Sequence, residues 1–238
     1  MLLEICTTSL QSAKNAQTAG AHRIELCSEL AVGGITPSYG LIQQTVQTVN
    51  IPVFVLIRPR GGTFTYSEEE FEVMLADIEI CKKLGVAGIV SGVLHSDNTL
   101  DSIQTQRLVE CAAPLEFTFH RAFDQVPDAF ETLSELEQIG VKRILSSGKK
   151  TSAETGLDLL VKLKEKSQNV LILPGGGIHA ENVFLFQQNG FTEIHASVSG
   201  VFQENNPLPI SMNSPKFLDE TKIYHSDIEK IRSIINKI

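Results

Sequence analysis

The feature of this sequence that most constrains its fold is a regular alternation of short apolar runs with segments of helical periodicity. Each apolar run is rich in Val, Ile, Leu or Phe and is followed by a polar turn and a helix-like segment. This order is typical of parallel β-strands joined by crossover helices. The predicted strands begin near Leu2, Arg23, Pro52, Val86, Leu115, Lys142, Val170 and Thr192.

The spacing of these runs predicts a TIM barrel of the α/β class. Successive strands begin about 27 residues apart, close to the minimum for a strand, a helix and two loops, and a TIM barrel of eight such units typically has about 250 residues. Because the chain has 238 residues, we expect a single domain over residues 1–238. The longest irregular segment, from Gln203 to Lys222, is expected to be a loop over one face of the barrel.

Several helix starts carry local capping signals. Ser67 and Glu70 match a capping box. In this motif each of the two side chains accepts a hydrogen bond from the backbone amide of the other residue. The same pattern recurs at Thr151–Glu154 and at Ser226–Glu229, and Thr36–Pro37 supplies an N-cap followed by proline. We therefore expect helices to begin at these four places.

Charge and composition restrict the partners. The chain has 28 acidic and 20 basic side chains and a formal net charge of -8 at pH 7, which argues against nucleic acid and anionic membranes as partners. No segment approaches the roughly 20 apolar residues that span a bilayer. The N-terminus has neither the basic segment nor the apolar run of a secretory signal, so we expect a cytoplasmic protein.

The four cysteines are expected to be reduced thiols. They occur at Cys6, Cys27, Cys81 and Cys111, without a CxxC pair, and are too few in a chain of this length for a disulfide framework. Cys81 and Cys111 fall on amphipathic segments and are interpreted as core residues. Cys6 and Cys27 are therefore the two that remain available for metal.

A Glu-x-Cys motif ends each of the first two predicted strands, as Glu4 with Cys6 and as Glu25 with Cys27. Because side chains alternate along a strand and the flanking residues are apolar, all four side chains should point into the barrel, near the end where TIM barrels build their sites. Glu4 and Glu25 could serve as catalytic acid or base, and the two thiolates could bind a soft metal. Alternatively, the cysteines are small core residues and the glutamates pair with an arginine.

The third predicted strand leads into the segment RPRGG. Arg58 and Arg60 are held by a proline and followed by two glycines, a combination that predicts a rigid receptor for phosphate or carboxylate. Alternatively, the two arginines form salt bridges with Glu4 and Glu25.

The fifth predicted strand places His120 at the mouth of the barrel, since Phe117 and Phe119 alternate with the inward positions. There His120 could be a general base, a metal ligand or a hydrogen-bond donor to a substrate, or it could be a structural histidine. Asp124 and Arg121 follow directly and are further candidates for ligand binding.

Small residues follow the last three predicted strands, at Ser147, at Gly175, Gly176 and Gly177, and at Ser197. The backbone of a glycine-rich loop can cradle a phosphate, and the loops after strands seven and eight of TIM barrels often do so. We therefore interpret these residues as candidate ligand-binding groups, with a simple tight turn as the alternative.

Seven segments, in this order, resemble the CutC family, known as copper homeostasis proteins: LEIC, RIELC, GGITPSYG, IRPRGGTFTYS, SGVL, FHRAFD and SSG. The likeness extends over nearly the whole chain. It implies a TIM barrel, a cytoplasmic and usually homo-oligomeric protein, and an association with copper. It also implies that Cys6 and Cys27 are copper ligands, in a site for Cu(I). Some relatives have a second cysteine directly after the first, whereas this chain has Thr7, which implies a lower copper affinity.

Three functional hypotheses follow. In the first, the chain is a copper-binding homeostasis protein with Cys6 and Cys27 as ligands and His120 as a candidate to assist them. In the second, it is a TIM-barrel enzyme that acts on a small phosphorylated or carboxylated metabolite. Glu4 or Glu25 would then be the acid or base, His120 its partner, and the arginines of RPRGG would hold the anion. A structural or interaction module is a third reading of the sequence.

Overall fold

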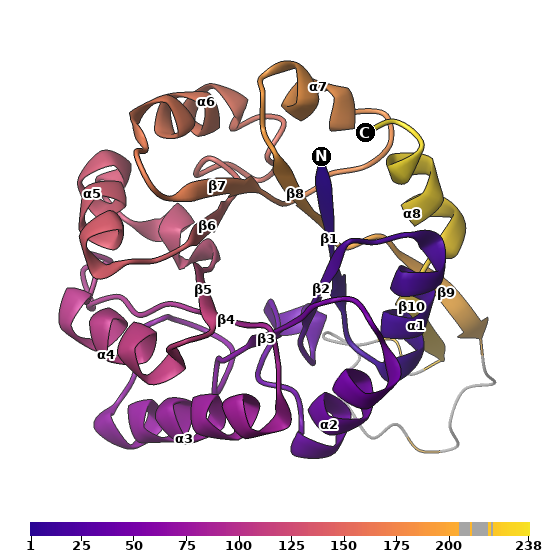
Figure 1. Cartoon of the computed structure of the whole chain (residues 1–238), viewed down its shortest axis with the longest axis horizontal. Helices are drawn as coiled ribbons and strands as arrows, with labels where there is room; N and C mark the ends of the chain where they lie inside the picture. Colours follow the sequence, from indigo (N-terminus) through magenta and orange to yellow (C-terminus); the bar gives the residue numbers. More distant parts are fainter. Residues whose placement is uncertain (205–209, 211–218, 220) are drawn as a thin grey trace.

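The computed structural model describes residues 1–204, 210, 219 and 221–238. Eight parallel strands form a nearly closed barrel inside a ring of helices (Figure 1). This arrangement confirms the predicted α/β TIM barrel, and each strand begins within two residues of its predicted start. The strands are β1 Leu2–Thr7, β2 Arg23–Leu26, β3 Val53–Leu56, β4 Gly88–Ser91, β5 Glu116–Phe119, β6 Arg143–Ser146, β7 Leu171–Pro174 and β8 Glu193–Ala196.

The strands pair in chain order from β1 to β7, and β8 pairs with β1. The remaining seam, between β7 and β8, is joined by a single parallel bridge between Gly175 and His195. In this register Glu4 of β1 lies beside both Arg23 of β2 and His195 of β8. Barrel closure therefore brings together residues from the two ends of the sequence.

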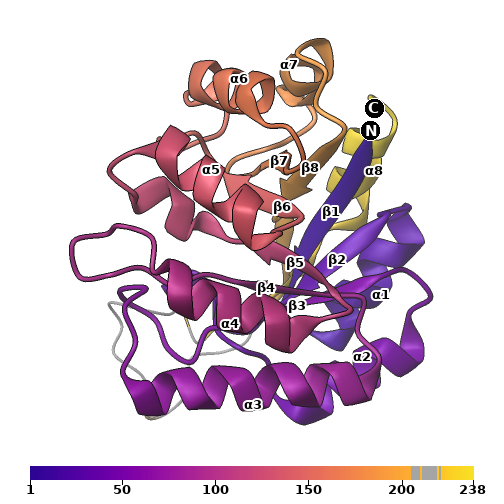
Figure 2. The same ribbon diagram turned by 60° about the vertical axis from the view of Figure 1, so that its left-hand side comes forward.

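The helices cover the outside of the barrel (Figure 2). None of the described helices is both long enough and apolar enough to cross a membrane. The helices are α1 Leu10–Ala19, α2 Tyr39–Thr48, α3 Glu68–Leu84, α4 Ser102–Ala112, α5 Ala129–Ile139, α6 Leu157–Lys166, α7 Val183–Gln188 and α8 Ile228–Ile235. Two short 3-10 helices are η1 Leu30–Val32 and η2 Arg121–Gln125.

One of the four predicted capping motifs forms: Ser67 and Glu70 make the capping box of α3. The start predicted at Thr36 is wrong, because the Thr36 hydroxyl instead accepts from the backbone of Arg58 and Ser38 caps α2. A local motif cannot form a cap when tertiary contacts take its side chain.

The other two predicted capping boxes do not form either, although α8 begins within two residues of Ser226, as predicted. Residues 151–156 form turns, and α6 begins only after Gly156. Ser226 is the last residue of a strand, and Asp227 caps α8 by accepting from the amides of Glu229 and Lys230. A carboxylate directly after the strand therefore takes the capping position.

An antiparallel pair, β9 Ser199–Glu204 and β10 Lys222–Ser226, follows the barrel strands. The loop predicted from Gln203 to Lys222 therefore begins inside β9 and ends inside β10, so its predicted boundaries are wrong. The rest of that prediction, at 205–209, 211–218 and 220, lies outside the described residues.

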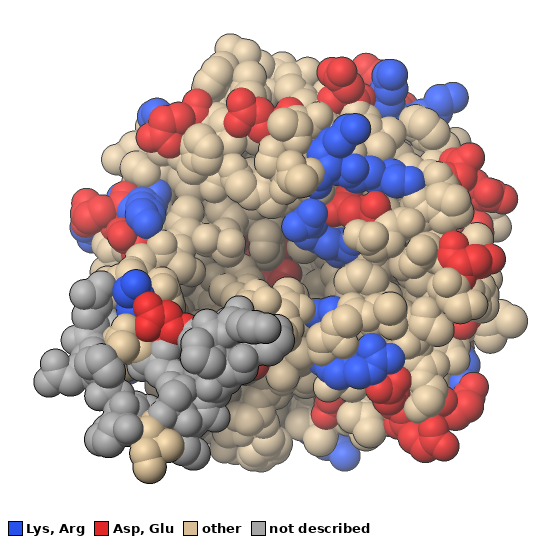
Figure 3. Space-filling view, turned by 180° about the vertical axis from the view of Figure 1, so that it is seen from behind, with Lys and Arg blue, Asp and Glu red and all other residues tan. Residues whose placement is uncertain are grey.

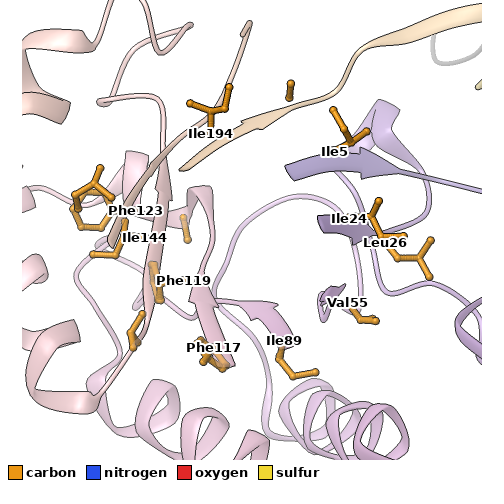
Figure 4. Close-up of a cluster of buried hydrophobic side chains, with 14 of the residues drawn as sticks. Ile5, Ile24, Leu26, Val55, Ile89, Phe117, Phe119, Phe123, Ile144 and Ile194 are labelled. Atoms are coloured by element: carbon orange, nitrogen blue, oxygen red, sulfur yellow. The ribbon is translucent and has the colours of Figure 1, made fainter. Parts of the chain in front are cut away.

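The main apolar core lies between the strands and the helices. Ile5, Ile24, Val55, Ile89 and Ile194 project from the outer faces of their strands toward this layer and are fully buried (Figure 4). The inner face differs, because much of it carries thiol, acidic and basic side chains. TIM-barrel interiors are usually filled with branched apolar residues, so this polar interior points to a site.

Candidate functional site

A cavity of about 200 Å³ lies at the carboxyl ends of the barrel strands. The surface is hollowed there, and Lys and Arg side chains lie along one side of the hollow (Figure 3). Eight residues predicted from the sequence line this cavity, together with Phe64 and His195. The eight are Cys6, Glu25, Cys27, Arg58, His120, Arg121, Gly176 and Ser197.

Cys6, near the end of β1, and Cys27, just after β2, meet inside the barrel. Their sulfur atoms are 3.5 Å apart and share a hydrogen bond, and both side chains are buried. The bond to Cys27, together with burial and the charges of Glu25 and Glu4, raises the pKa of Cys6 well above its usual value. Cys6 is therefore a neutral thiol at pH 7, and a metal ion would have to displace its proton.

Glu4 is buried but held in its ionised form by two basic partners. The Nδ1–H of His195 donates to Glu4 Oε1 at 2.8 Å, and Arg23 Nε donates to Oε2. Burial opposes ionisation, but the hydrogen bond from His195 and the positive charge of Arg23 outweigh it and lower the pKa of Glu4 to about 2. The pKa of His195 is raised, since the bond to Glu4 and the charge of Glu25 outweigh its own burial.

Glu25 lies beside this pair but lacks its partners. Its Oε2 is 3.7 Å from His195 Nδ1, and this oxygen has no hydrogen-bond partner in the described part of the chain. Burial and the neighbouring Glu4 raise the pKa of Glu25 to about 7, against the opposing charges of His195 and Arg23. A carboxyl that gains and loses its proton near neutral pH is suited to acid–base chemistry.

An ion network below the cavity fixes Arg23. Arg23 Nη2 donates to Glu193 Oε2 at 2.7 Å, and Arg143 Nε donates to the same oxygen at 2.7 Å. The ring of Phe54 packs against both guanidinium groups. Its centroid is 4.7 Å from Arg23 Cζ and 5.4 Å from Arg143 Cζ. The network holds Arg23 in place beneath Glu4.

Arg58 lines the cavity and is nearly fully buried. Its Nη1 donates to the carbonyls of Val32 and Gly34 and its Nη2 to that of Gly62, each at 2.8 Å. The alternative of salt bridges from the RPRGG arginines to Glu4 and Glu25 is therefore wrong, because Arg23 occupies that position.

Arg60 points away from the cavity and pairs with Glu70 at the start of α3. Its Nη2 also donates to the carbonyl of Thr65 at 2.8 Å, so it supports the loop that carries Phe64. The structure thus separates two arginines that the sequence presents as equivalent.

His120 lines the cavity as a neutral ring. Its Nδ1 accepts from the backbone N–H of Ala122 at 3.3 Å, which places the ring proton on Nε2. Burial and the charge of Arg58 lower the pKa of His120 to about 3. Of the three predicted roles, this geometry favours a hydrogen-bond donor. Gly92 makes room for the ring, since a Cβ there would lie 2.8 Å from Nδ1.

Asp124 and Ser147 lie beside the cavity and organise the loop after β6. Asp124 accepts from the hydroxyl of Ser146 at 2.7 Å and from the amides of Ser147 and Lys149 at 3.1 Å. Arg121 links this cluster to the cavity, because it donates to Asp124 and to Ser147 at 2.8 Å and lines the wall itself.

The three glycines after β7 have different positions. Gly175 forms the bridge that closes the barrel, and Gly176 lines the cavity. Gly176 has φ of 105°, where L side chains are strained, and a Cβ there would lie 3.3 Å from the Ser147 Cβ. Gly177 is also in the left-handed region, and Ser197 lines the cavity from the end of β8.

Sequence reasoning missed four residues of this interior: Arg23, Arg143, Glu193 and His195. The alternation that identified the Glu-x-Cys motifs could have found them. Glu193, His195 and Ser197 alternate with apolar residues on β8, and Arg23 precedes Glu25 by two positions on β2.

Comparison with known proteins gives one consistent result. The profile of the CutC family matches residues 1–200. The human copper homeostasis protein cutC homolog is 42% identical over 240 residues, which cover 98% of this chain and 87% of that protein. A family protein CutC of Photorhabdus laumondii is 40% identical over 228 residues, covering 94% of this chain and 92% of that protein.

Comparison with solved structures also finds a CutC protein. A CutC protein from Streptococcus agalactiae superposes with a TM-score of 0.79 and 34% identity, covering 83% of this chain and 98% of that one. A thiamine phosphate pyrophosphorylase from Pyrococcus furiosus, at 14% identity and a TM-score of 0.58 over 99% of this chain and 94% of that one, shares the fold alone. Because the chain is 40% and 42% identical to the two CutC relatives over nearly its full length, it belongs to the CutC family.

Proposed function

We propose that this chain is a copper homeostasis protein that binds Cu(I) through the thiolates of Cys6 and Cys27. The observation that carries the proposal is the 3.5 Å contact between two buried sulfur atoms in the wall of the cavity. Thiolates are the ligands that select Cu(I), and related proteins are named for copper homeostasis.

The surroundings of the thiols fit a bound cation. Glu25 and Glu4 lie close enough to Cys6 to raise its pKa, so their negative charge would stabilise a positive ion at the sulfur atoms. The same charges hold the proton on Cys6, so copper would compete with that proton. The affinity should therefore rise with pH.

Anaerobic titration of the reduced protein with Cu(I), in competition with a chelator, tests this proposal. We expect one ion per chain in the wild type. The double variant Cys6→Ser, Cys27→Ser should bind more than about a hundredfold more weakly, since outer-shell partners alone are worth about 10–100-fold. Cys111→Ser, a half-buried cysteine outside the cavity, is the matched control. Unchanged stoichiometry and affinity in the double variant would exclude these ligands.

We further propose that residues 1–238 form a single domain that acts in the cytoplasm as a homo-oligomer. Its reduced thiols and acidic charge support a cytoplasmic location without a nucleic-acid partner. Val201 and Phe202 of β9, with Ile223 and Tyr224 of β10, leave large apolar side chains exposed, which supports self-association. Sedimentation equilibrium measures the oligomeric state directly, and a monomer at micromolar concentration would contradict it.

A specific observation favours a second candidate function, a proton-transfer enzyme that acts on a small anionic metabolite. Glu25 combines a pKa of about 7 with a place in the cavity wall. It would serve as the acid or base, with Glu4 orienting His195 beside it and His120 donating to the substrate. Solvent-deuterium exchange into small organic acids, followed by NMR, tests this role. Exchange that persists in Glu25→Gln would contradict it.

A further inference from the structure

Unpaired polar atoms gather around the cavity. Among the described residues, eight buried side-chain nitrogen or oxygen atoms lack a hydrogen-bond partner, and three belong to side chains that line it: Glu25 Oε2, Arg58 Nε and His120 Nε2. Buried polar groups in folded proteins are nearly always paired, because leaving one unpaired is costly. Three such atoms on side chains that line one cavity point to a ligand that pairs with them.

Two of the three atoms are donors that belong together. The ring of Phe64 packs against both of their side chains, with its centroid 4.8 Å from that of His120 and 4.9 Å from Arg58 Cζ. His120 Nε2 carries the ring proton because Nδ1 accepts from the Ala122 amide. Arg58 Nε always carries a hydrogen.

The charge on this side of the cavity is positive and uncompensated. The hydrogen bonds of Arg58 go to three backbone carbonyls, the Tyr66 hydroxyl is a further polar neighbour, and no carboxylate of the described residues lies within ion-pair distance of it. Arg121, on the same cavity, adds a second guanidinium, although its charge is shared with Asp124. Guanidinium groups match carboxylate and phosphate oxygens, so an oxyanion is the group that fits here.

The third unpaired atom is an acceptor. Glu25 Oε2 is 3.7 Å from the nearest nitrogen of His195, which is too far for a hydrogen bond. It therefore remains available to a hydroxyl group of a ligand. A molecule that pairs all three atoms needs acceptor oxygens for the two donors and a hydroxyl for Glu25, and the positive charge of Arg58 favours an oxyanion as the acceptor.

We infer that the cavity binds a small hydroxylated organic acid. Its carboxylate or phosphate oxygens accept from Arg58 Nε and His120 Nε2, and its hydroxyl donates to Glu25 Oε2. The size agrees, because 200 Å³ equals the liquid volume of about seven water molecules at about 30 Å³ each. The inference names the ligand of the second proposed function, and it does not depend on copper.

Calorimetry on the metal-free protein tests the inference with matched probes. Glycolate carries both groups, acetate lacks the hydroxyl, and ethylene glycol lacks the charge. Glycerol phosphate with its control glycerol tests the phosphate form. We expect saturable binding of glycolate, glycerol phosphate or both, with weaker binding of acetate and none of the uncharged compounds. Failure of every oxyanion probe to bind would overturn the inference.

Variants assign the binding to the named atoms. His120→Leu removes the Nε2–H donor, and Arg58→Lys keeps the positive charge but removes the Nε–H donor together with the guanidinium fork; each should weaken binding about tenfold, which corresponds to about 1.4 kcal/mol. Arg107→Ala and His179→Ala, which change surface side chains outside the cavity that contact Glu72 and Glu181, are the controls. Unchanged affinity in both His120→Leu and Arg58→Lys would also overturn the inference.

Two further variants protect the test from effects on folding. His120→Gln keeps an N–H donor and should retain more affinity than His120→Leu, and circular dichroism of each unliganded variant identifies those that fold. Glu25→Leu should abolish the preference for glycolate over acetate. Because the measurement is of binding, an absence of deuterium exchange would refute the enzyme and leave the ligand site standing.

Discussion

Replacing Glu25 by glutamine should stabilise the protein above neutral pH. In the folded chain, burial and the nearby Glu4 raise the pKa of Glu25 from its ordinary 4.5 to about 7. The folded state therefore holds this proton more tightly than the unfolded state does. The stability contributed by the protonated carboxyl is fully present below pH 4.5 and is lost as the pH rises through about 7.

The magnitude follows from the two pKa values. They differ by about 2.5, and each unit corresponds to about 1.4 kcal/mol, so the ionised form costs about 3 kcal/mol above pH 7. Glutamine has nearly the same shape and no charge, so Glu25→Gln avoids this cost. For a chain of this length the gain corresponds to a rise in Tm of about 6–12 °C.

Guanidinium unfolding of the metal-free protein at pH 4.5 and pH 8 measures the effect. We expect wild type and Glu25→Gln to be nearly equal at pH 4.5 and to differ by about 3 kcal/mol at pH 8. Glu165→Gln, on the exposed face of α6, should change stability at neither pH. If Glu25→Gln is no more stable than wild type at pH 8, the ionised carboxylate is already satisfied and the reasoning fails.

Two other predictions concern the barrel interior. Arg23→Met should cost about 3–5 kcal/mol, because it leaves the carboxylates of Glu4 and Glu193 buried without the guanidinium between them. Chemical denaturation at pH 7 measures this loss, and a cost below about 1 kcal/mol would contradict the ion network. The ring of His120 should stay neutral between pH 5 and 8, since its pKa is about 3. The NMR chemical shifts of the His120 ring should therefore be constant between pH 5 and 8. A titration midpoint in that range would contradict the burial of the ring beside the charge of Arg58.

The order of the strands and the inward direction of the Glu-x-Cys side chains could be predicted from the sequence. Both depend on periodicity: apolar runs recur every 27 residues or so, and side chains alternate along each strand. Glu4, Cys6, Glu25 and Cys27 all lie inside the barrel, as the alternation predicts. Local capping motifs predicted the helix caps less well, because a side chain that could cap a helix can instead lie in a strand or bond to a neighbouring loop.

The partners of the buried acids could not be predicted in the same way. Glu4 meets His195 only because β8 pairs with β1, which joins residues 191 positions apart. Its other partner, Arg23, depends on the register between β1 and β2. No local pattern encodes either contact.

The two RPRGG arginines show the same limit. Both follow β3 and carry the same charge, yet Arg58 is buried in the cavity wall while Arg60 pairs with α3. The barrel, the family resemblance and the residue types at the barrel mouth can be predicted from sequence, because they follow from periodicity and motif. Which charges are paired and which are left for a ligand depends on distances that barrel closure creates, so that distinction requires the folded structure.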